Sequence, residues 1–226
     1  KNNIKNLVYI SSDKCYLNDN RKHTYKENDI LGGDDVYSSS KAATEIIFSS
    51  FHKSFFYKNK KIKYATARAG NVIGGGDMKE NRIIPDIYKS ILKNKPLVVR
   101  NPKAVRPWQH VLEPVYGYLI LGSLLINNKI SSKIIPNWNF GPNPTNFKTV
   151  IDVVKNILLK WKIKKKIIIT KKKIFKESGI LTLDSKKSFK ELNWRPKLNF
   201  KETIQLTVEW YKVLKSNKDL EEITAK

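Results

Sequence analysis

The stretch Asn6-Leu-Val-Tyr-Ile-Ser11 decides the fold of this chain, together with Ser12-Asp13-Lys14-Cys15-Tyr16 directly after it. The first run is apolar and β-branched, which is typical of a strand buried in a parallel sheet. A hydroxyl, a carboxyl and an amine follow it at Ser12, Asp13 and Lys14. Because ligands of open α/β sheets bind at the carboxyl ends of the strands, these side chains are predicted to lie at a ligand site.

A tyrosine and a lysine, Tyr37 and Lys41, come next at a spacing of four residues. On a helix, this interval places both side chains on one face, one turn apart. The chain repeats the spacing at Tyr57/Lys61 and Tyr211/Lys215. Tyr37 and Lys41 differ from these pairs in position, because the loop Gly32-Gly33-Asp34-Asp35 can return them over the end of the predicted strand. We therefore expect a site at Tyr37/Lys41, and solvated surface tyrosines at Tyr57 and Tyr211.

The residue types indicate acid/base chemistry coupled to a redox step. A phenol has an ordinary pKa of about 10, so it is a poor base at neutral pH unless a nearby cation favours the phenolate. Lys41 can supply that cation. A tyrosinate beside the Ser12 hydroxyl can take the proton of a substrate alcohol while hydride leaves the carbon. Since no side chain accepts hydride, a nicotinamide cofactor is implied.

Composition excludes several other classes of protein. A chain of 226 residues with 40% hydrophobic content can bury a substantial core. Its longest apolar run, residues 118–126, is too short to span a membrane. One cysteine, Cys15, rules out an intramolecular disulfide and indicates a reducing compartment, which we expect to be the cytoplasm. The histidines, His23, His52 and His110, are too scattered to predict a metal site.

The formal charge of +24 raises the question of nucleic-acid binding. Only six of the 44 basic residues are arginines, the side chain that phosphate and base recognition favours. The lysines are spread along the chain, and their local concentration at 155–176 surrounds the strand-like run 167–170. The charge is therefore interpreted as a solvated surface that can steer a small anionic substrate, without a specific nucleic acid or membrane as partner.

Strand-like and helix-like segments alternate along the chain, which predicts right-handed crossovers and a parallel sheet. The expected strands are 6–11, 62–68, 97–100, 138–141 and 167–170, and the expected helices are 37–56, 83–93, 113–126, 149–161 and 200–214. The predicted fold class is α/β. It is a partial Rossmann-type, doubly wound parallel sheet, with a smaller α/β substrate-binding domain. We expect residues 1–75 and 103–141 in the domain that binds the nicotinamide cofactor, 76–102 and 142–214 in the substrate-binding domain, and a polar tail at 215–226.

The glycine-rich stretch Gly70-Asn-Val-Ile-Gly-Gly-Gly-Asp77 predicts a sharp turn or a close approach to a ligand. It lacks the glycine spacing of a dinucleotide fingerprint. A nucleotide-binding sheet normally opens with a strand, a glycine-rich turn and a helix that holds the pyrophosphate, and this sequence contains no such element. The hypothesis is that the chain lacks the N-terminal half of its dinucleotide-binding domain and is inactive alone.

Several motifs together resemble the CDP-glucose 4,6-dehydratases, a family of the extended short-chain dehydrogenase/reductase superfamily. They include Ser12-Asp13-Lys14-Cys15-Tyr16, Tyr37-Ser-Ser-Ser-Lys41, Gly74-Gly-Gly-Asp77, Arg106-Pro-Trp-Gln-His110, Asp184-Ser-Lys186 and Leu192-Asn-Trp-Arg-Pro196. The resemblance covers nearly the whole chain. The tyrosine–lysine pair identifies only the superfamily, whereas Ser-Asp-Lys, Gly-Gly-Gly-Asp and Arg-Pro-Trp-Gln-His are more specific. Related dehydratases of other nucleotide sugars generally carry glutamate where this chain has Lys14.

The resemblance implies dehydration of CDP-glucose to CDP-4-keto-6-deoxyglucose with NAD as cofactor. Tyr37, assisted by Ser12 and Lys41, deprotonates the 4-hydroxyl as hydride leaves C4. Lys14 then takes the C5 proton, Asp13 protonates the departing 6-hydroxyl, and hydride returns to C6. The resemblance also implies cofactor contacts at Ser11, Tyr37, Lys41 and Ala69, and substrate contacts at Asn71, Arg82, Arg100, Arg106 and Gln109. A homodimer is expected for the complete protein.

Three other interpretations remain open. A sugar-nucleotide epimerase of the same superfamily needs Tyr37 and Lys41 but not the pair Asp13/Lys14, and it yields an inverted hexose in place of a 4-keto-6-deoxy sugar. A basic nucleic-acid-binding protein would show steep salt-dependent retention on DNA or RNA. A non-catalytic remnant of the enzyme is the third.

Overall fold

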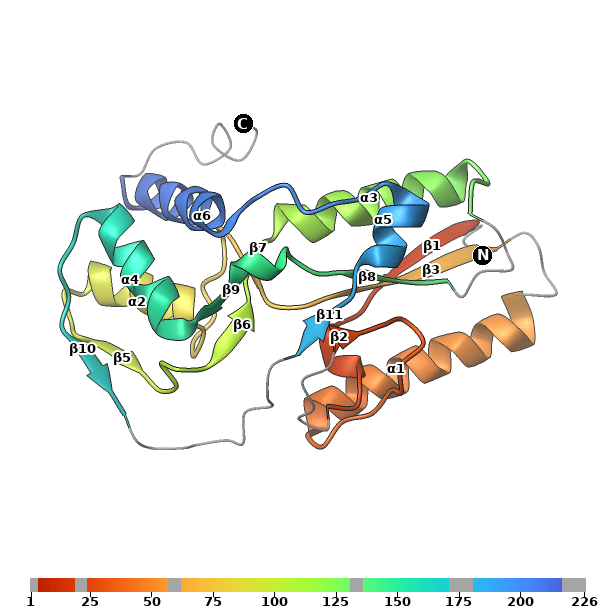
Figure 1. Ribbon diagram of the computed structural model, residues 1–226, viewed down its shortest axis with the longest axis horizontal. Coiled ribbons are helices and arrows are strands. Elements are labelled where there is room, and N and C mark those ends of the chain that lie inside the picture. Colours follow the sequence, from red (N-terminus) through yellow and green to blue (C-terminus); the bar gives the residue numbers. More distant parts are fainter. Residues whose placement is uncertain (1–3, 19–23, 57–61, 131–135, 171–180, 217–226) are drawn as a thin grey trace. The chain divides into compact units, whose positions relative to one another are not determined.

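The computed structural model describes residues 4–18, 24–56, 62–130, 136–170 and 181–216 (Figure 1). The chain divides into two compact units. Unit 1 comprises Lys1–Gly70, Leu112–Gly141 and Ser178–Lys197, and unit 2 comprises Asn71–Val111, Pro142–Glu177 and Leu198–Lys226. Each unit is described by itself below.

Unit 1 is built on a three-stranded parallel sheet. Strand β3 (Lys63–Ala69) lies in the middle, with β1 (Asn6–Ile10) on one side and β8 (Asn137–Phe140) on the other. Ile10 pairs with Ala67, so the carboxyl ends of β1 and β3 reach the same edge of the sheet. The expected parallel α/β architecture is confirmed.

Helices cover both faces of this sheet (Figure 1). Successive side chains of a strand point to opposite faces, and β3 alternates accordingly. Its alanines join Leu121 of α3 (Leu112–Ile126) in one core cluster. On the other face, the ring of Tyr64 packs against Phe48 of α1 (Val36–Phe51), with centroids 4.9 Å apart. This two-sided covering is the doubly wound arrangement.

The core beside β8 is completed by the segment that contains α5 (Lys186–Leu192). Trp194 meets Phe140 edge to face, with ring centroids 5.0 Å apart. Helix α3 approaches the same ring at Gly117, where an added Cβ would lie 2.3 Å from Phe140. Close packing of these elements therefore places residues 178–197 in unit 1, whereas the sequence had suggested the other domain.

Several short elements complete unit 1. Their bounds are Asp13–Cys15 for the 3-10 turn η1, Thr24–Tyr25 for β2, His52–Phe56 for the π-helical turn η2 that extends α1, and Thr182–Leu183 for β11. Strands β2 and β11 pair in parallel. A small apolar cluster joins Cys15 of η1 to Tyr25 of β2 and includes Tyr16 and Leu181.

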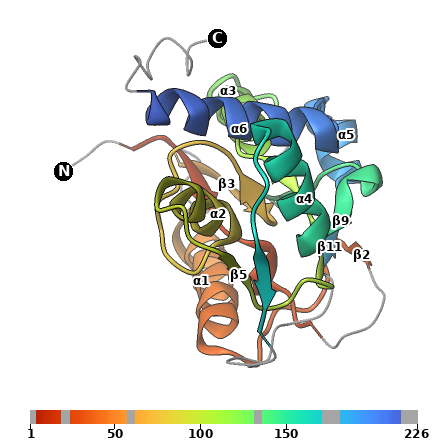
Figure 2. The ribbon, with the colours of Figure 1, turned by 90° about the vertical axis from the view of Figure 1, so that its left-hand side faces the viewer.

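Unit 2 packs helices against short strand pairs. Its helices are α2 (Ile83–Leu92), α4 (Val150–Trp161) and α6 (Phe200–Lys215), and η3 (Pro144–Asn146) is a 3-10 turn. Its strand pairs are β5 (Leu97–Val99) with β10 (Ile167–Ile169), β4 (Val72–Ile73) with β7 (Gln109–His110), and β6 (Val105–Pro107) with β9 (Phe147–Thr149). Only the last pair is antiparallel among those described. Helix α4 lies against α6 (Figure 2).

Capping chemistry explains where α4 and α6 begin. Thr149 caps α4 and exchanges hydrogen bonds with Asp152, and Asn199 and Glu202 do the same for α6. Each such box satisfies backbone N–H groups that the first turn of a helix leaves without partners. The pairings β4–β7 and β6–β9 tie 103–111 to unit 2. This placement also differs from the expected division, which had put 71–75 and 103–111 in the first domain.

Candidate active site

The chain turns sharply after β1, and η1 presents the predicted polar cluster there. The Ser12 hydroxyl accepts a hydrogen bond from the Lys14 backbone N–H at 3.2 Å and donates to Asp13 Oδ1 at 3.1 Å. Asp13 is 4% exposed, while Ser12 and Lys14 are half-buried. Burial of Cys15 raises the pKa of its thiol to about 12, so this cysteine is a packing residue within the turn.

The predicted tyrosine–lysine pair lies on the first turns of α1. The Lys41 ammonium is 5.6 Å from the centroid of the Tyr37 ring, in the range of a cation–π contact. Tyr37 is 55% exposed, so its phenol is open to a ligand. The sequence had predicted that the two side chains share a helix face, and this is confirmed.

The loop before α1 joins the helix to η1. The Gly32 N–H donates to Cys15 O at 2.9 Å, and the Ser39 hydroxyl donates to Gly33 O at 2.7 Å. An added Cβ on Gly33 would lie 2.3 Å from Ser38 Cβ, so the loop can pack this closely only with glycine there. The two polar clusters are thus held next to each other within unit 1, as the sequence had indicated.

Asp35 is the N-cap of α1, and the charge of Lys14 affects its pKa. Its carboxylate accepts from the Ser38 backbone N–H at 3.0 Å and from the Ser38 hydroxyl at 2.6 Å, as an N-cap does. These hydrogen bonds lower the pKa of Asp35, and the positive charge of Lys14 lowers it further. Lys14 therefore lies within electrostatic range of the beginning of α1.

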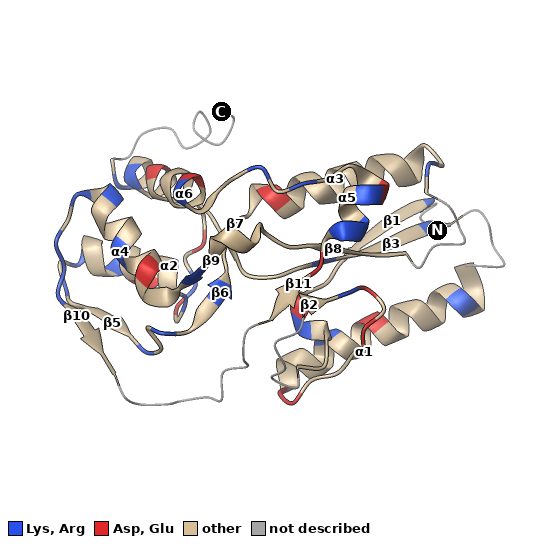
Figure 3. Ribbon diagram, viewed as in Figure 1, with Lys and Arg blue, Asp and Glu red and all other residues tan. Residues whose placement is uncertain are grey.

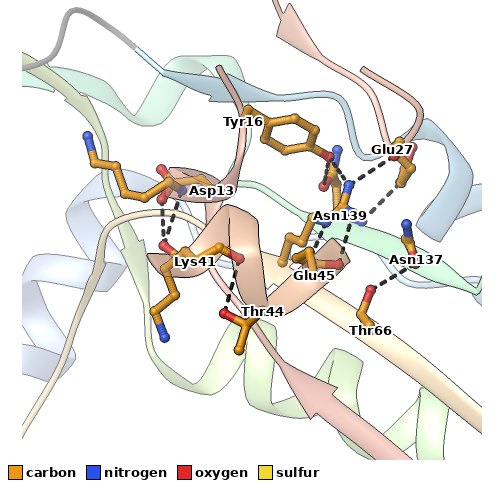
Figure 4. A network of polar contacts seen from close by, with 12 residues as sticks. Asp13, Tyr16, Glu27, Lys41, Thr44, Glu45, Thr66, Asn137 and Asn139 are labelled. Carbon is orange, nitrogen blue, oxygen red and sulfur yellow. Dashed lines mark hydrogen bonds and ion pairs between the residues drawn. The ribbon is translucent and has the colours of Figure 1, made fainter. Parts of the chain in front are cut away.

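A buried arginine, Arg68, contacts a residue next to each cluster, and its partners Tyr16 and Glu45 are labelled in Figure 4. Arg68, near the carboxyl end of β3, pairs with both carboxylate oxygens of Glu45 on α1, at 2.9 and 3.0 Å. Its Nη1 donates to the Tyr16 hydroxyl at 2.8 Å and to Glu27 O at 2.9 Å. The Tyr16 hydroxyl in turn donates to Asn139 Oδ1 on β8 at 2.8 Å.

The sequence did not reveal this network, although two signals for it exist. Arg68 is the charged residue in an otherwise uncharged and mostly buried part of β3, and a buried charge requires a partner. Glu45 follows Lys41 by one helical turn, on the same face of α1. Burial would lower the pKa of Arg68, but the hydrogen bonds of Glu45 and the nearby Tyr16 raise it overall, so the guanidinium stays charged.

Of the residues expected to touch NAD, Tyr37 and Lys41 lie on α1, and Ser11 and Ala69 lie at the carboxyl ends of β1 and β3. Ser11 follows β1, and its backbone N–H donates to Ala67 O at 2.8 Å. The Ser11 hydroxyl is buried, and no described residue forms a hydrogen bond with it. Ala69 ends β3 and is 9% exposed. A buried hydroxyl without a protein partner, beside an exposed phenol and a lysine, fits a cofactor that brings its own polar groups.

The residues expected to hold the substrate all belong to unit 2. Arg82 pairs with Asp77 at 3.1 Å, and its side chain is 59% exposed. Arg100 is exposed and donates to Asn81 O at 2.9 Å, whereas Arg106 is half-buried and donates to Val105 O. Asn71 is half-buried, and its carbonyl accepts from the N–H of Gln109, which is 1% exposed. Their roles toward a ligand stay predictions.

Other residues singled out in the sequence have structural surroundings. Trp108 and Trp138 are buried. His110 is also buried, and desolvation lowers its pKa. Trp210 is half-buried against the glycine-rich turn, where an added Cβ on Gly75 would lie 2.1 Å from the Trp210 ring. Tyr211 was expected at the surface, and this was wrong: it is 1% exposed and donates to Asp77 O at 2.5 Å. Tyr57 and Lys61 lie outside the described residues.

The described residues contain no group of acidic, histidine or cysteine side chains that could hold a metal ion. None of their helices is long and apolar enough to cross a membrane.

Comparison with known proteins identifies the family. A family model described as GDP-mannose 4,6 dehydratase matches residues 1–207. The chain belongs to this dehydratase family. A CDP-glucose 4,6-dehydratase from Salmonella typhimurium strain LT2 is 39% identical over 222 residues, which cover 96% of this chain and 61% of that relative. The chain therefore spans about three fifths of the length of this relative.

Solved structures place the fold of this dehydratase-family chain among nucleotide-sugar enzymes. The dTDP-glucose 4,6-dehydratase of Bacillus anthracis strain Ames, crystallised with NAD, matches with a TM-score of 0.76 at 23% identity, over 96% of this chain and 64% of that one. The UDP-glucuronic acid 4-epimerase of Bacillus cereus, with NAD and UDP-glucuronic acid, also gives a TM-score of 0.76, at 16% identity, over 92% of this chain and 62% of that one. These likenesses establish the Rossmann-type fold.

Proposed function

We propose that this chain carries the catalytic groups of an NAD-dependent CDP-glucose 4,6-dehydratase, a lyase that releases water from CDP-glucose. The observation that carries the proposal is the joining of two clusters in unit 1, Ser12-Asp13-Lys14 on η1 and Tyr37/Lys41 on α1, by the loop between them. The dehydratase from Salmonella typhimurium at 39% identity supports this choice of substrate.

The first stage of the proposed reaction needs a base at the sugar 4-hydroxyl. Tyr37 takes this proton, Ser12 donates a hydrogen bond to the oxygen, and Lys41 favours the phenolate through its charge. The chemistry that bound NAD supplies is acceptance of hydride from C4 and its return to C6. Ser11, Tyr37, Lys41 and Ala69 are the residues that would hold the reacting part of the cofactor.

The second stage removes water across C5 and C6. The ketone at C4 acidifies the C5 hydrogen, Lys14 takes that proton, and Asp13 protonates the departing 6-hydroxyl. Negative charge develops on O4 in this step, so the hydroxyl donors Tyr37 and Ser12 stabilise it. C5 then regains a proton as hydride reaches C6, which leaves CDP-4-keto-6-deoxyglucose and unchanged cofactor.

Substrate binding is proposed for residues of unit 2. The diphosphate carries anionic oxygens, for which arginine forks and amide donors are the favoured partners. Asn71, Arg82 and Arg106 are proposed to hold it, and Arg100 and Gln109 to contact the cytosine or support the binding surface. The exposure of the Arg82 side chain, 59%, leaves its guanidinium available to an anion.

The test is product analysis after incubation of the longest native form of the protein with NAD and CDP-glucose. A 4-keto-6-deoxy product with loss of water supports the proposal, while an inverted hexose indicates an epimerase. Parallel incubations with dTDP-glucose and GDP-mannose examine the choice of nucleotide sugar. Conversion of either one in preference to CDP-glucose would contradict the assignment of substrate.

A nucleic acid is not proposed as partner. The basic residues are distributed over both units and are interspersed with acidic ones (Figure 3). Retention on DNA that weakens steeply with salt would contradict this view.

For the complete protein we propose a homodimer, supported by exposed apolar side chains of α1 and η2, at Ile46, Ile47, Phe51 and Phe55. Sedimentation of the native form tests it. A location in the cytoplasm stays a prediction.

A further inference from the structure

We propose that Arg68 is a positioning residue, which fixes η1 relative to α1 and so sets the geometry between Asp13/Lys14 and Tyr37/Lys41. The inference rests on the proposed function, and it concerns a residue to which the proposed chemistry gives no role. It starts from the observation that the Arg68 guanidinium contacts a neighbour of each catalytic cluster, Glu45 on α1 and Tyr16 directly after η1.

One edge of the guanidinium contacts α1 through Glu45, and its other end contacts Tyr16, directly after η1. Nε and Nη2 form two parallel hydrogen bonds to Glu45, which lies one turn beyond Lys41 on α1. Nη1 donates to the hydroxyl of Tyr16, the residue that closes η1 through its backbone hydrogen bond to Asp13 O. Because the guanidinium is planar and rigid, these contacts fix the separation between helix and turn.

The Tyr16 hydroxyl extends the connection to β8. It accepts from Arg68 and donates to Asn139 Oδ1, so both capacities of this hydroxyl are satisfied inside the protein. Asn139 is fully buried, and its Nδ2 donates to Tyr25 O. The turn that carries Asp13 and Lys14 is therefore anchored to two strands of the sheet by one side chain.

The cost of burying these charges points to a role other than stability. The Arg68 and Glu45 side chains are 1% and 2% exposed. A buried ion pair stabilises a fold weakly, because removing two charges from water offsets their attraction, and an apolar pair of similar size often does as well. What an apolar pair cannot provide is a fixed, directional connection between η1 and α1. Catalytic rates are sensitive to displacements of about 1 Å.

The two stages of the reaction should depend on the anchor differently. Hydride transfer from C4 relies chiefly on Tyr37 and Lys41, which α1 carries. Removal of water relies on Asp13 and Lys14, which η1 carries. If the Tyr16 contact is lost, η1 loosens while the Arg68–Glu45 pair still holds α1. The second stage should then slow more than the first, and reduced cofactor should accumulate.

Tyr16→Phe tests this with the smallest change, since it removes one hydroxyl and keeps the ring stacked on Tyr25. Tyr25→Phe is the matched control: it removes a hydroxyl from the same apolar cluster, one that donates to Leu17 O at 3.0 Å. In single-turnover experiments on the longest native form, we expect Tyr16→Phe to slow water removal about tenfold or more and leave hydride transfer within about twofold. Tyr25→Phe should change neither rate by more than about twofold.

Two readouts that do not depend on turnover accompany the kinetics. Thermal unfolding should shift more in Tyr16→Phe than in Tyr25→Phe, because the Tyr16 hydroxyl makes two internal hydrogen bonds and the Tyr25 hydroxyl makes one. Amide hydrogen exchange in the peptide that covers η1 should accelerate in Tyr16→Phe only. Equal slowing of both stages in Tyr16→Phe, or equal exchange in the two variants, would overturn the positioning role.

Arg68→Lys provides a second, independent variant. Lysine keeps the positive charge but cannot form the parallel pair with Glu45 and reach Tyr16 together. The variant that combines Tyr16→Phe with Arg68→Lys completes a double-mutant cycle. If Arg68 acts through Tyr16, this double variant should slow water removal no more than Arg68→Lys alone. Additive effects would overturn the proposal. Parent protein that gives no 4-keto-6-deoxy product would overturn the proposed function, whereas an active parent with unaffected variants would overturn only the role of Arg68.

Discussion

At the scale of single residues, Tyr37 has the most direct part in the proposed reaction. Its phenol is 55% exposed, and the Lys41 ammonium is 5.6 Å from its ring centroid. Tyr37→Phe removes the proposed base and little packing, so we expect turnover to fall by about 10²-fold or more. The unfolding free energy should change by no more than about 0.5 kcal/mol. Steady-state kinetics with CDP-glucose and thermal unfolding measure the two effects.

Tyr211→Phe is the control for this change, because Tyr211 also precedes a lysine by four residues. Tyr211 is buried in unit 2 and donates to Asp77 O. Losing that hydrogen bond should cost about 1 kcal/mol of stability and leave turnover near that of the parent. Equal losses of turnover in the two variants would mean that Tyr37 has no special role.

Replacing Lys14 tests whether this residue acts in the proposed CDP-glucose reaction or has only a structural role. If it takes the C5 proton, Lys14→Met should stop the reaction after the first hydride transfer. Reduced cofactor would then accumulate on the protein and be visible by absorbance, while hydrogen from solvent would no longer enter at C5. Wild-type rates in Lys14→Met would remove this residue from the mechanism.

The sequence pattern led to the proposed catalytic residues and missed the buried network around Arg68. Ser12, Asp13, Lys14, Tyr37 and Lys41 follow a strand end or a helical spacing, both of which are local patterns. Arg68 contacts residues that lie 23 and 52 positions away in the chain. Such contacts depend on how elements pack, so a local pattern can show that Arg68 needs a partner but not which one it has.

At the scale of elements, apolar periodicity predicted the long helices and the main strands to within a few residues. The expected helix 83–93 is α2 (Ile83–Leu92), and the expected strand 62–68 is β3 (Lys63–Ala69). Short elements escaped because tertiary pairing creates them. Strand β7 has two residues, and α5 begins at Ser185 without a side-chain cap hydrogen bond, so neither leaves a periodic signal.

The loop between η1 and α1 is the element whose packing sets the site, and its glycines offer a matched pair of variants. At Gly33 an added Cβ would lie 2.3 Å from Ser38 Cβ and 2.7 Å from the Ser38 carbonyl carbon, so the helix backbone must move. Gly33→Ala should cost about 1–3 kcal/mol, as overpacking does. At Gly32 the nearest atom is Cδ1 of the flexible Leu17 side chain at 3.1 Å, so Gly32→Ala should cost less than about 1 kcal/mol.

Denaturant unfolding of the two alanine variants gives the comparison, and their turnover shows whether the loop also matters for chemistry. A misplaced α1 should slow hydride transfer in Gly33→Ala more than in Gly32→Ala. Equal stability and equal rates would show that the close approach of Gly33 to α1 does not define the site.

At the scale of the whole molecule, the proposed catalytic groups belong to unit 1 and the proposed substrate-binding groups to unit 2. The expected boundaries differed from the observed ones because domain membership here depends on pairing between distant segments. Residues 178–197 come late in the chain and yet complete the core beside β8 through Leu192 and Trp194. Hydropathy along the sequence shows that such residues are buried, but not against which unit.

Cofactor binding gives the prediction for the molecule as a whole. The sequence contains no Gly-x-x-Gly-x-x-Gly turn between a strand and a helix, the element that normally holds the pyrophosphate of NAD. The contacts proposed for Ser11, Tyr37, Lys41 and Ala69 concern the reacting part of the cofactor, so its pyrophosphate needs another binding element. We expect the 226-residue chain, shown to be folded by circular dichroism, to bind NAD more weakly than micromolar and to show no turnover.

Supplying the part of the Salmonella typhimurium relative that this chain does not cover, fused or as a second chain, should restore both binding and turnover. Ser11→Ala in the restored protein should weaken NAD binding by several-fold, because the cofactor would lose the hydrogen bond proposed for the buried Ser11 hydroxyl. Calorimetry with NAD measures both effects. Micromolar binding by the 226-residue chain alone would show that this chain already contains a site for the pyrophosphate.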